Sequence, residues 1–188
     1  MIEVSVFRLH ENAIVPSYGT SLSTCFDLGF YPSTSDPIVN GYDKFNLQIQ
    51  RYIDDKGLLI NRGDRLLVPT GLIFKIQDKR NSIESFSDIT AEREELGQFS
   101  IRLHARSGMS LKRGLVLANA EGVVDVDYQQ QVYILLTNIS EITQTIAIGE
   151  RIAQGEVVTN EKVHFLEINS TPTQHSERGG GFGSTGTL

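Results

Sequence analysis

Residues 65–76 read Arg-Leu-Leu-Val-Pro-Thr-Gly-Leu-Ile-Phe-Lys-Ile. The stretch is rich in leucine, β-branched and aromatic side chains, and Pro69, Thr70 and Gly71 interrupt it after the length of one strand. Proline presets a turn, and glycine tolerates the backbone angles that a tight turn requires. The stretch therefore predicts two consecutive strands joined by a turn.

Apolar runs of similar length occur along the rest of the chain. They lie at residues 2–9, 99–104, 132–136, 145–148 and 152–158. Turn-forming residues fall between the runs, at 63–64, 107–108, 112–114 and 149–150. Because this spacing suits an antiparallel sandwich, jelly roll or barrel, we predict an all-β fold.

Two segments depart from the strand pattern. Residues 81–97 are mostly polar and contain serines that could cap a helix, which predicts a short helix in a surface insertion. The last twenty residues lack apolar periodicity and are expected to be mobile when no ligand is bound. We therefore predict a domain at 1–168, with insertions at about 36–59 and 77–97, followed by a glycine-rich arm at 169–188.

Composition limits the kinds of partner. The chain has 188 residues, 39% of them hydrophobic, which is enough for one domain with a buried core. Its net charge of −6 argues against direct nucleic-acid binding and against binding to an anionic membrane, because both need a basic face. No segment approaches the ~20 apolar residues of a membrane span, and the N-terminus lacks a signal-peptide pattern. The single cysteine, Cys25, suggests a reducing compartment, so we expect a cytoplasmic protein.

Three segments carry candidate chemistry, and each also has an ordinary structural explanation. The glycine-rich tail reads as a flexible terminus, yet Phe182 and the preceding Arg178 could close over a nucleotide base and its phosphates. Residues 106–108, Arg-Ser-Gly, form either an ordinary turn or a small anion-binding nest. Residues 119–128 contain two acids two positions apart, which suit either metal ligands or a solvated turn.

The order of these segments resembles the five motifs of the trimeric dUTP diphosphatases (dUTPases). The matching stretches are 23–28 (Ser-Thr-Cys-Phe-Asp-Leu), 105–109 (Ala-Arg-Ser-Gly-Met), 119–128 (Asn-Ala-Glu-Gly-Val-Val-Asp-Val-Asp-Tyr), 149–154 (Gly-Glu-Arg-Ile-Ala-Gln) and 178–186 (Arg-Gly-Gly-Gly-Phe-Gly-Ser-Thr-Gly). Residues 62–72 also resemble the family's strand and turn between the first two motifs. The resemblance spans nearly the whole chain.

The resemblance implies a β jelly roll, or β-clip, that forms a homotrimer with active sites shared between subunits. The implied reaction is hydrolysis of dUTP to dUMP and pyrophosphate, which limits uracil in DNA and supplies dUMP for thymidylate synthesis. Mg²⁺ would be held mainly by the triphosphate. Asp125 matches the carboxylate that activates the attacking water, and Asp27 matches an outer-shell partner of the metal's waters.

By the same resemblance, the other site residues divide into three groups. Those matched to the phosphates and the surrounding hydrogen bonds are Arg106, Ser107, Gly108, Arg151 and Gln154. Those matched to the uracil-binding hairpin and the deoxyribose are Asn119, Gly122, Val123, Val124 and Tyr128, of which Tyr128 packs under the sugar. Those matched to the closing arm are Arg178, Phe182, Gly183 and Ser184, with the Phe182 ring stacked on uracil.

The sequence departs from the family pattern in two places. Cys25-Phe26 replaces the usual Gly-Tyr type pair of the first motif, and Gln130 stands where the family usually has glycine. The insertions at 36–59 and 77–97 are either surface decoration or a binding site for a protein partner.

Two other functions compete with dUTP hydrolysis. The related dCTP deaminases would place a catalytic glutamate where this chain has Leu135, and a deaminase without its general base would not work. A catalytically idle member that binds nucleotide or a regulatory protein is the second rival. The presence of Asp125, Ser107 and Arg151 argues against it.

Overall fold

The computed structural model describes residues 2–33, 37–78 and 99–173. Within these ranges the chain forms strands and one short helix. They are β1 (Ile2–Arg8), β2 (Phe26–Gly29), β3 (Ile38–Tyr42), β4 (Gln48–Asp54), β5 (Gly57–Ile60), β6 (Arg65–Pro69), β7 (Leu72–Asp78), β8 (Phe99–Ala105), α2 (Ser107–Arg113), β9 (Leu115–Leu117), β10 (Gly122–Asp125), β11 (Tyr133–Asn138), β12 (Gln144–Ile146) and β13 (Arg151–Thr159).

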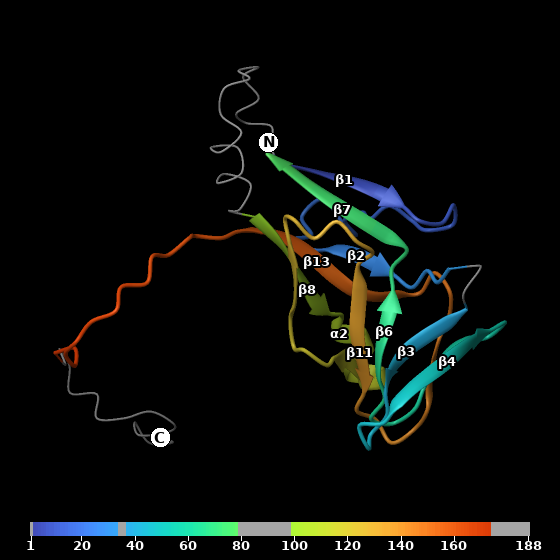
Figure 1. The fold of residues 1–188 in the computed structure, drawn as a ribbon. Helices are drawn as coiled ribbons and strands as arrows, with labels where there is room; N and C mark the ends of the chain where they lie inside the picture. The colour runs from blue at the N-terminus through green and yellow to red at the C-terminus, as the bar shows by residue number, and fades with distance from the viewer. Residues whose placement is uncertain (1, 34–36, 79–98, 174–188) are drawn as a thin grey trace.

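The described strands form two main sheets and a ribbon (Figure 1). One sheet has the order β12-β5-β4-β3-β6-β11-β9, the other has the order β10-β8-β13-β2, and β1 pairs with β7. The pairings are antiparallel. Strand β7 directly follows β6, so the turn at residues 70–71 carries the chain from the larger sheet into the ribbon.

Alternating side chains build the core between the sheets. On β6, Leu66 and Val68 are fully buried, whereas Leu67 between them is 46% exposed. On β8, Ile101 and Leu103 are buried in the same way. This is the two-residue period of a strand with one face toward the core, and each such buried side chain contributes roughly 1.5–3 kcal/mol.

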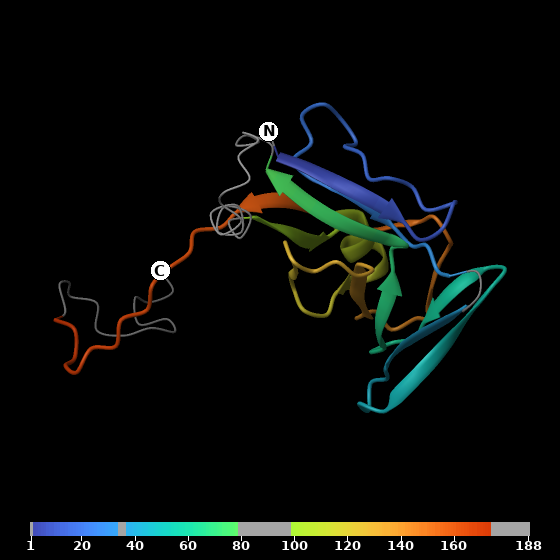
Figure 2. The ribbon, with the colours of Figure 1, turned by 45° about the horizontal axis from the view of Figure 1, so that its top comes forward.

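The prediction of an all-β fold is confirmed. The apolar runs correspond to β1, β6, β7, β8, β11, β12 and β13. The sequence analysis did not identify β2, β3, β4, β5, β9 and β10, most of which are short. Strands β3–β5 occupy most of the first predicted insertion and pair within the larger sheet, and Val39, Leu58 and Ile60 are buried there. The β3–β4 hairpin nevertheless projects from the rest of the fold (Figure 2).

The prediction of a turn at residues 107–108 is wrong, because helix α2 begins there. The Ser110 amide donates to the Arg106 carbonyl, and Met109 is the helix residue that is buried. Gly114 ends the helix in the left-handed region, with φ of 64°. A helix of seven residues with one buried side chain leaves almost no periodic signal in the sequence.

The predicted helix within 81–97 lies outside the described residues, as do the arm residues from 174 onward. Residues 160–173 leave the body of the protein as extended chain (Figure 1). No helix within the described ranges is long and apolar enough to cross a membrane.

Candidate active site

Strand β13 brings four of the predicted site residues together: Asp27, Arg106, Arg151 and Gln154. It pairs with β2 on one side and with β8 on the other, so that Gln154 lies opposite both Asp27 and His104. Arg106 follows the last residue of β8, and Arg151 is the first residue of β13. This register places both arginines within hydrogen-bonding distance of Asp27.

The Asp27 carboxylate bridges the two arginines. Arg106 Nε donates to Asp27 Oδ1 over 2.8 Å, and Arg151 Nη1 donates to Asp27 Oδ2 over 2.8 Å. Arg106 Nη1 also donates to the Arg151 carbonyl over 3.3 Å. The side chains of Asp27 and Arg106 are 21% and 27% exposed, whereas Arg151 is 61% exposed. Two guanidinium groups thus share one carboxylate, which leaves net positive charge available for an anion.

Gln154 and Cys25 lie beside this cluster. Gln154 Nε2 donates to the Ala105 carbonyl over 3.1 Å, directly before Arg106 in the chain. Burial raises the pKa of the Cys25 thiol, and the neighbouring carboxylates of Glu156 and Asp27 raise it further. The thiol is therefore a poor nucleophile at neutral pH.

Ser107 and Gly108 extend the cluster into the first turn of α2. Both residues are exposed. A methyl group added at Gly108 would meet no atom within 4 Å, so the chain's own packing does not require glycine there. The open space beside Gly108 lets a ligand or another chain approach the backbone.

Arg113 ties the far end of α2 to the turn before Arg151. Its guanidinium donates to Gln144 Oε1 over 3.1 Å and also bonds to the Glu150 carboxylate and the Thr145 carbonyl. The second Glu150 oxygen accepts from the Ala147 amide over 3.1 Å. This network holds the segments that carry Ser107 and Arg151 in a fixed relation.

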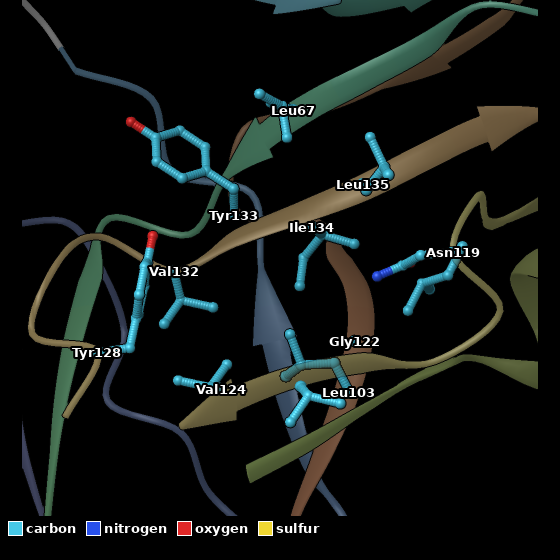
Figure 3. Close-up of a pocket in the computed structure, with 12 residues that line it drawn as sticks. Leu67, Leu103, Asn119, Gly122, Val124, Tyr128, Val132, Tyr133, Ile134 and Leu135 are labelled. Atoms are coloured by element: carbon cyan, nitrogen blue, oxygen red, sulfur yellow. The ribbon is translucent and has the colours of Figure 1, made fainter. Parts of the chain in front are cut away.

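A pocket of about 400 Å³ opens between the two main sheets (Figure 3). Strands β6 and β11 contribute one wall, and β8 and β10 contribute the other. The lining residues are Leu67, Leu103, Leu117, Asn119, Gly122, Val123, Val124, Tyr128, Val132, Tyr133, Ile134 and Leu135. In Figure 3, Asn119 lies on one side of the pocket with its amide toward the cavity, and Tyr128 lies on the opposite side.

The segment between β9 and β10 shapes one wall of the pocket. Ala120 adopts a left-handed conformation with φ of 61°, which is rare for a residue with a side chain and places strain in this turn. A Cβ at Gly122 would lie 3.0 Å from Leu103 Cβ, so glycine lets β10 approach β8 without displacing Leu103. Strand β10 is an edge strand that pairs with β8 alone among the described strands. Its other edge is thus available for backbone hydrogen bonds to a ligand.

Asp125 ends β10, at some distance from the arginine cluster. It is exposed and lies opposite Ser100, near the start of β8, whereas Arg106 follows the end of β8. Six residues of extended chain between Ser100 and Arg106 span about 20 Å. Within one chain, Asp125 therefore lies apart from the cluster of Asp27, Arg106 and Arg151.

The four predicted residues of the arm, Arg178, Phe182, Gly183 and Ser184, lie outside the described residues. Within the part of the chain that is described, no group of three or more His, Cys, Asp or Glu side chains is arranged to hold a metal ion. The Asp27 carboxylate accepts one bond at each oxygen, and each oxygen has a further lone pair with which it can accept from a metal-bound water. This donor set fits a cation that is held mainly by a ligand's phosphates.

Comparison with known proteins assigns the family. The dUTPase family model matches residues 66–186, more than half of the chain. The chain belongs to the dUTPase family. The match covers β6 through β13 and so includes both the pocket and the two arginines.

Curated relatives and solved structures agree with this family. The chain is 35% identical to the deoxyuridine 5'-triphosphate nucleotidohydrolase of Caulobacter vibrioides over 71% of this chain and 73% of that protein. It is 29% identical to the corresponding protein of Anaplasma marginale over the full length of both. The dUTPase of Staphylococcus bacteriophage 80alpha has the same fold, with a TM-score of 0.66 at 17% identity over 98% of each chain. The dUTPase fold expected from the sequence is thus confirmed.

Proposed function

We propose that this member of the dUTPase family hydrolyses dUTP to dUMP and pyrophosphate. The observation that carries the proposal is the pocket between the sheets, where the free edge of β10 and the Asn119 amide face an otherwise apolar cavity. A backbone edge offers alternating donors and acceptors at fixed spacing, and so it can pair with the polar edge of a pyrimidine.

This pocket accounts for selection of the base. Uracil would pair with the backbone of Gly122–Val124 and with Asn119, and the walls of Leu103 and Ile134 would leave little room for a 5-methyl group. Cytosine would present a donor where uracil presents an acceptor, which leaves buried polar groups unpaired. Such mismatches are rejected more strongly than differences in apolar size.

Tyr128 accounts for selection of the sugar. Its ring lines the pocket on the side opposite Asn119 (Figure 3), where a deoxyribose would rest against it. A 2′-hydroxyl on the sugar would meet the ring. Replacement of Tyr128 by alanine should therefore raise hydrolysis of UTP relative to dUTP.

The arginine cluster supplies the phosphate site. Arg106 and Arg151 would contact the triphosphate together with the Ser107 hydroxyl and the backbone at Gly108. Mg²⁺, when bound, neutralises charge that develops on the phosphates, and the Asp27 carboxylate would accept from its waters. The Asp125 carboxylate would orient a water and accept its proton as the water attacks phosphorus in line with the leaving group.

A homotrimer with shared active sites would bring Asp125 of one copy beside the arginine cluster of another. Because about 20 Å of β8 separates Asp125 from Arg106 within one chain, Asp125 of one copy would act with the arginine cluster of another. The arm residues Arg178, Phe182, Gly183 and Ser184 would close the site, with the Phe182 ring on the uracil. The reaction would take place in the cytoplasm, where a single unpaired cysteine is typical.

A comparison of four nucleotides tests the proposal. Pyrophosphate release is measured from dUTP, dCTP, dTTP and UTP in parallel with Mg²⁺, and ammonia release is followed with dCTP. Rapid hydrolysis confined to dUTP is expected. Ammonia from dCTP would instead indicate a deaminase, despite Leu135 in the pocket wall, and no reaction with any of the four would indicate a binding protein.

A further inference from the structure

Tyr133 stands at the rim of the pocket, although no sequence motif pointed to it. It is the first residue of β11, it lines the cavity, and its ring is 42% exposed. Strand β11 lies between β6 and β9, and Tyr133 pairs with Pro69 of β6. The Tyr133 ring is therefore carried by a strand inside the larger sheet.

Gln131 links Tyr133 to Tyr128 through two hydrogen bonds. Its side-chain Nε2 donates to the Tyr133 hydroxyl over 2.7 Å, and its backbone carbonyl accepts from the Tyr128 hydroxyl over 2.9 Å. Both tyrosines lie on the same side of the pocket in Figure 3. Residues 126–132 form no strand, so these two bonds connect a loop residue to the sheet.

The Gln131 side chain depends on Tyr133 for its position. Gln131 Oε1 is buried and has no hydrogen-bond partner among the described residues. The amide is therefore held through its nitrogen alone, by the Tyr133 hydroxyl. Without that hydroxyl, the side-chain amide would lose its one hydrogen bond within the described residues, and its position would no longer be fixed.

We propose that Tyr133 and Gln131 are positioning residues that fix the Tyr128 ring and so set the preference for deoxyribose over ribose. The inference rests on the proposed function, in which the Tyr128 ring excludes the 2′-hydroxyl. The Tyr128 ring is 40% exposed, so packing alone leaves it some rotamer freedom. A ring that excludes one oxygen atom must be held in place, because a small displacement would admit that atom.

The test uses substitutions that remove single hydroxyl groups. Tyr133→Phe, Tyr128→Phe and the double variant are assayed for kcat and KM with dUTP and with UTP. Tyr52→Phe is the matched control, because Tyr52 is exposed on β4 of the same sheet and its hydroxyl makes no hydrogen bond within the described residues. One neutral hydrogen bond corresponds to a roughly threefold to tenfold change.

Tyr133→Phe is expected to lower the ratio of kcat/KM for dUTP to that for UTP by about threefold to tenfold, mainly through faster turnover of UTP. The double variant should fall no further than the larger single effect, because both bonds act through Gln131. Tyr52→Phe should leave the ratio unchanged.

Three results would overturn the inference: an unchanged ratio in Tyr133→Phe, an equal loss with both nucleotides, or additive effects in the double variant. A wild-type protein that hydrolyses dUTP and UTP equally well would instead refute the proposed function. The two failures are thus distinguishable in one set of assays.

Discussion

Replacement of Asp27 by asparagine tests whether one carboxylate positions both of the arginines that we propose to bind the phosphates. The substitution keeps the size of the side chain but removes its charge. Asparagine offers one acceptor oxygen, so at most one of the two bonds, to Arg106 or to Arg151, survives, and it survives without charge assistance. The guanidinium that loses its partner gains rotamer freedom.

The magnitude follows from the exposure of the pairs. A charge-assisted hydrogen bond contributes roughly 1.5–3 kcal/mol when it is well buried. The Arg106 bond is mostly shielded and should retain about 1 kcal/mol, whereas the Arg151 bond is exposed and should contribute about 0.5 kcal/mol. The combined loss is about 1.5 kcal/mol, which corresponds to a roughly tenfold fall in kcat/KM for dUTP.

Steady-state kinetics and calorimetry measure this effect. Asp27→Asn should weaken binding of a non-hydrolysable imido analogue of dUTP and leave dUMP affinity nearly unchanged, because dUMP lacks the outer phosphates. Asp55→Asn, an exposed acid in the β4–β5 turn, is the matched control. A rate within twofold of wild type, or an equal loss of dUMP affinity, would refute the reasoning. A changed Mg²⁺ requirement with unchanged analogue binding would show that Asp27 acts through the metal's waters.

Four further predictions follow from the site and its packing. Asp125→Asn should bind dUTP with near-normal affinity and lose most turnover, and a near wild-type kcat would show that the water is activated elsewhere. Deletion from Arg178 onward should impair catalysis and leave the assembly intact by light scattering, whereas dissociation would mean that the arm is structural. Gly122→Ala should destabilise the fold by roughly 1 kcal/mol in chemical denaturation, because its Cβ would lie 3.0 Å from Leu103 Cβ, while Gly108→Ala, with open space around it, should not. Since its pKa is raised, the Cys25 thiol should react with iodoacetamide more slowly than a free cysteine at pH 8, and the rate should rise only at higher pH.

The sequence predicts the fold well where strands are long and one face is buried. Leu66 and Val68 follow the two-residue period, and their strand is found as expected. The short strands β9 and β10 cannot be predicted in this way, because three or four residues do not establish a hydrophobic period. Helix α2 is not predicted from the sequence either, since Gly108 favours a turn.

The predicted site likewise contains residues that local motifs indicate and contacts that only the folded structure reveals. Residue types and their order predict Arg106, Arg151 and Asn119 as site residues, because each belongs to a local motif. Nothing local in the sequence could show that Asp27 bridges both arginines, since that contact depends on the register of β13 against β2. Tyr133 was missed for the same reason, since its link to Tyr128 depends on the path of the loop between β10 and β11.

Strand β8 has Asp125 opposite its first residues, and Arg106 follows its last residue. If copies of the chain complete each other's sites as proposed, a lone copy is a folded protein without a working site. Catalysis would then depend on protein concentration as well as on folding. Dilution below the concentration needed for assembly would abolish activity while each chain stayed folded. Because β8 would connect Asp125 in one site with Arg106 in another, it would also transmit a displacement from one subunit junction to the next. Nucleotide binding at one site of the trimer would then affect the other sites.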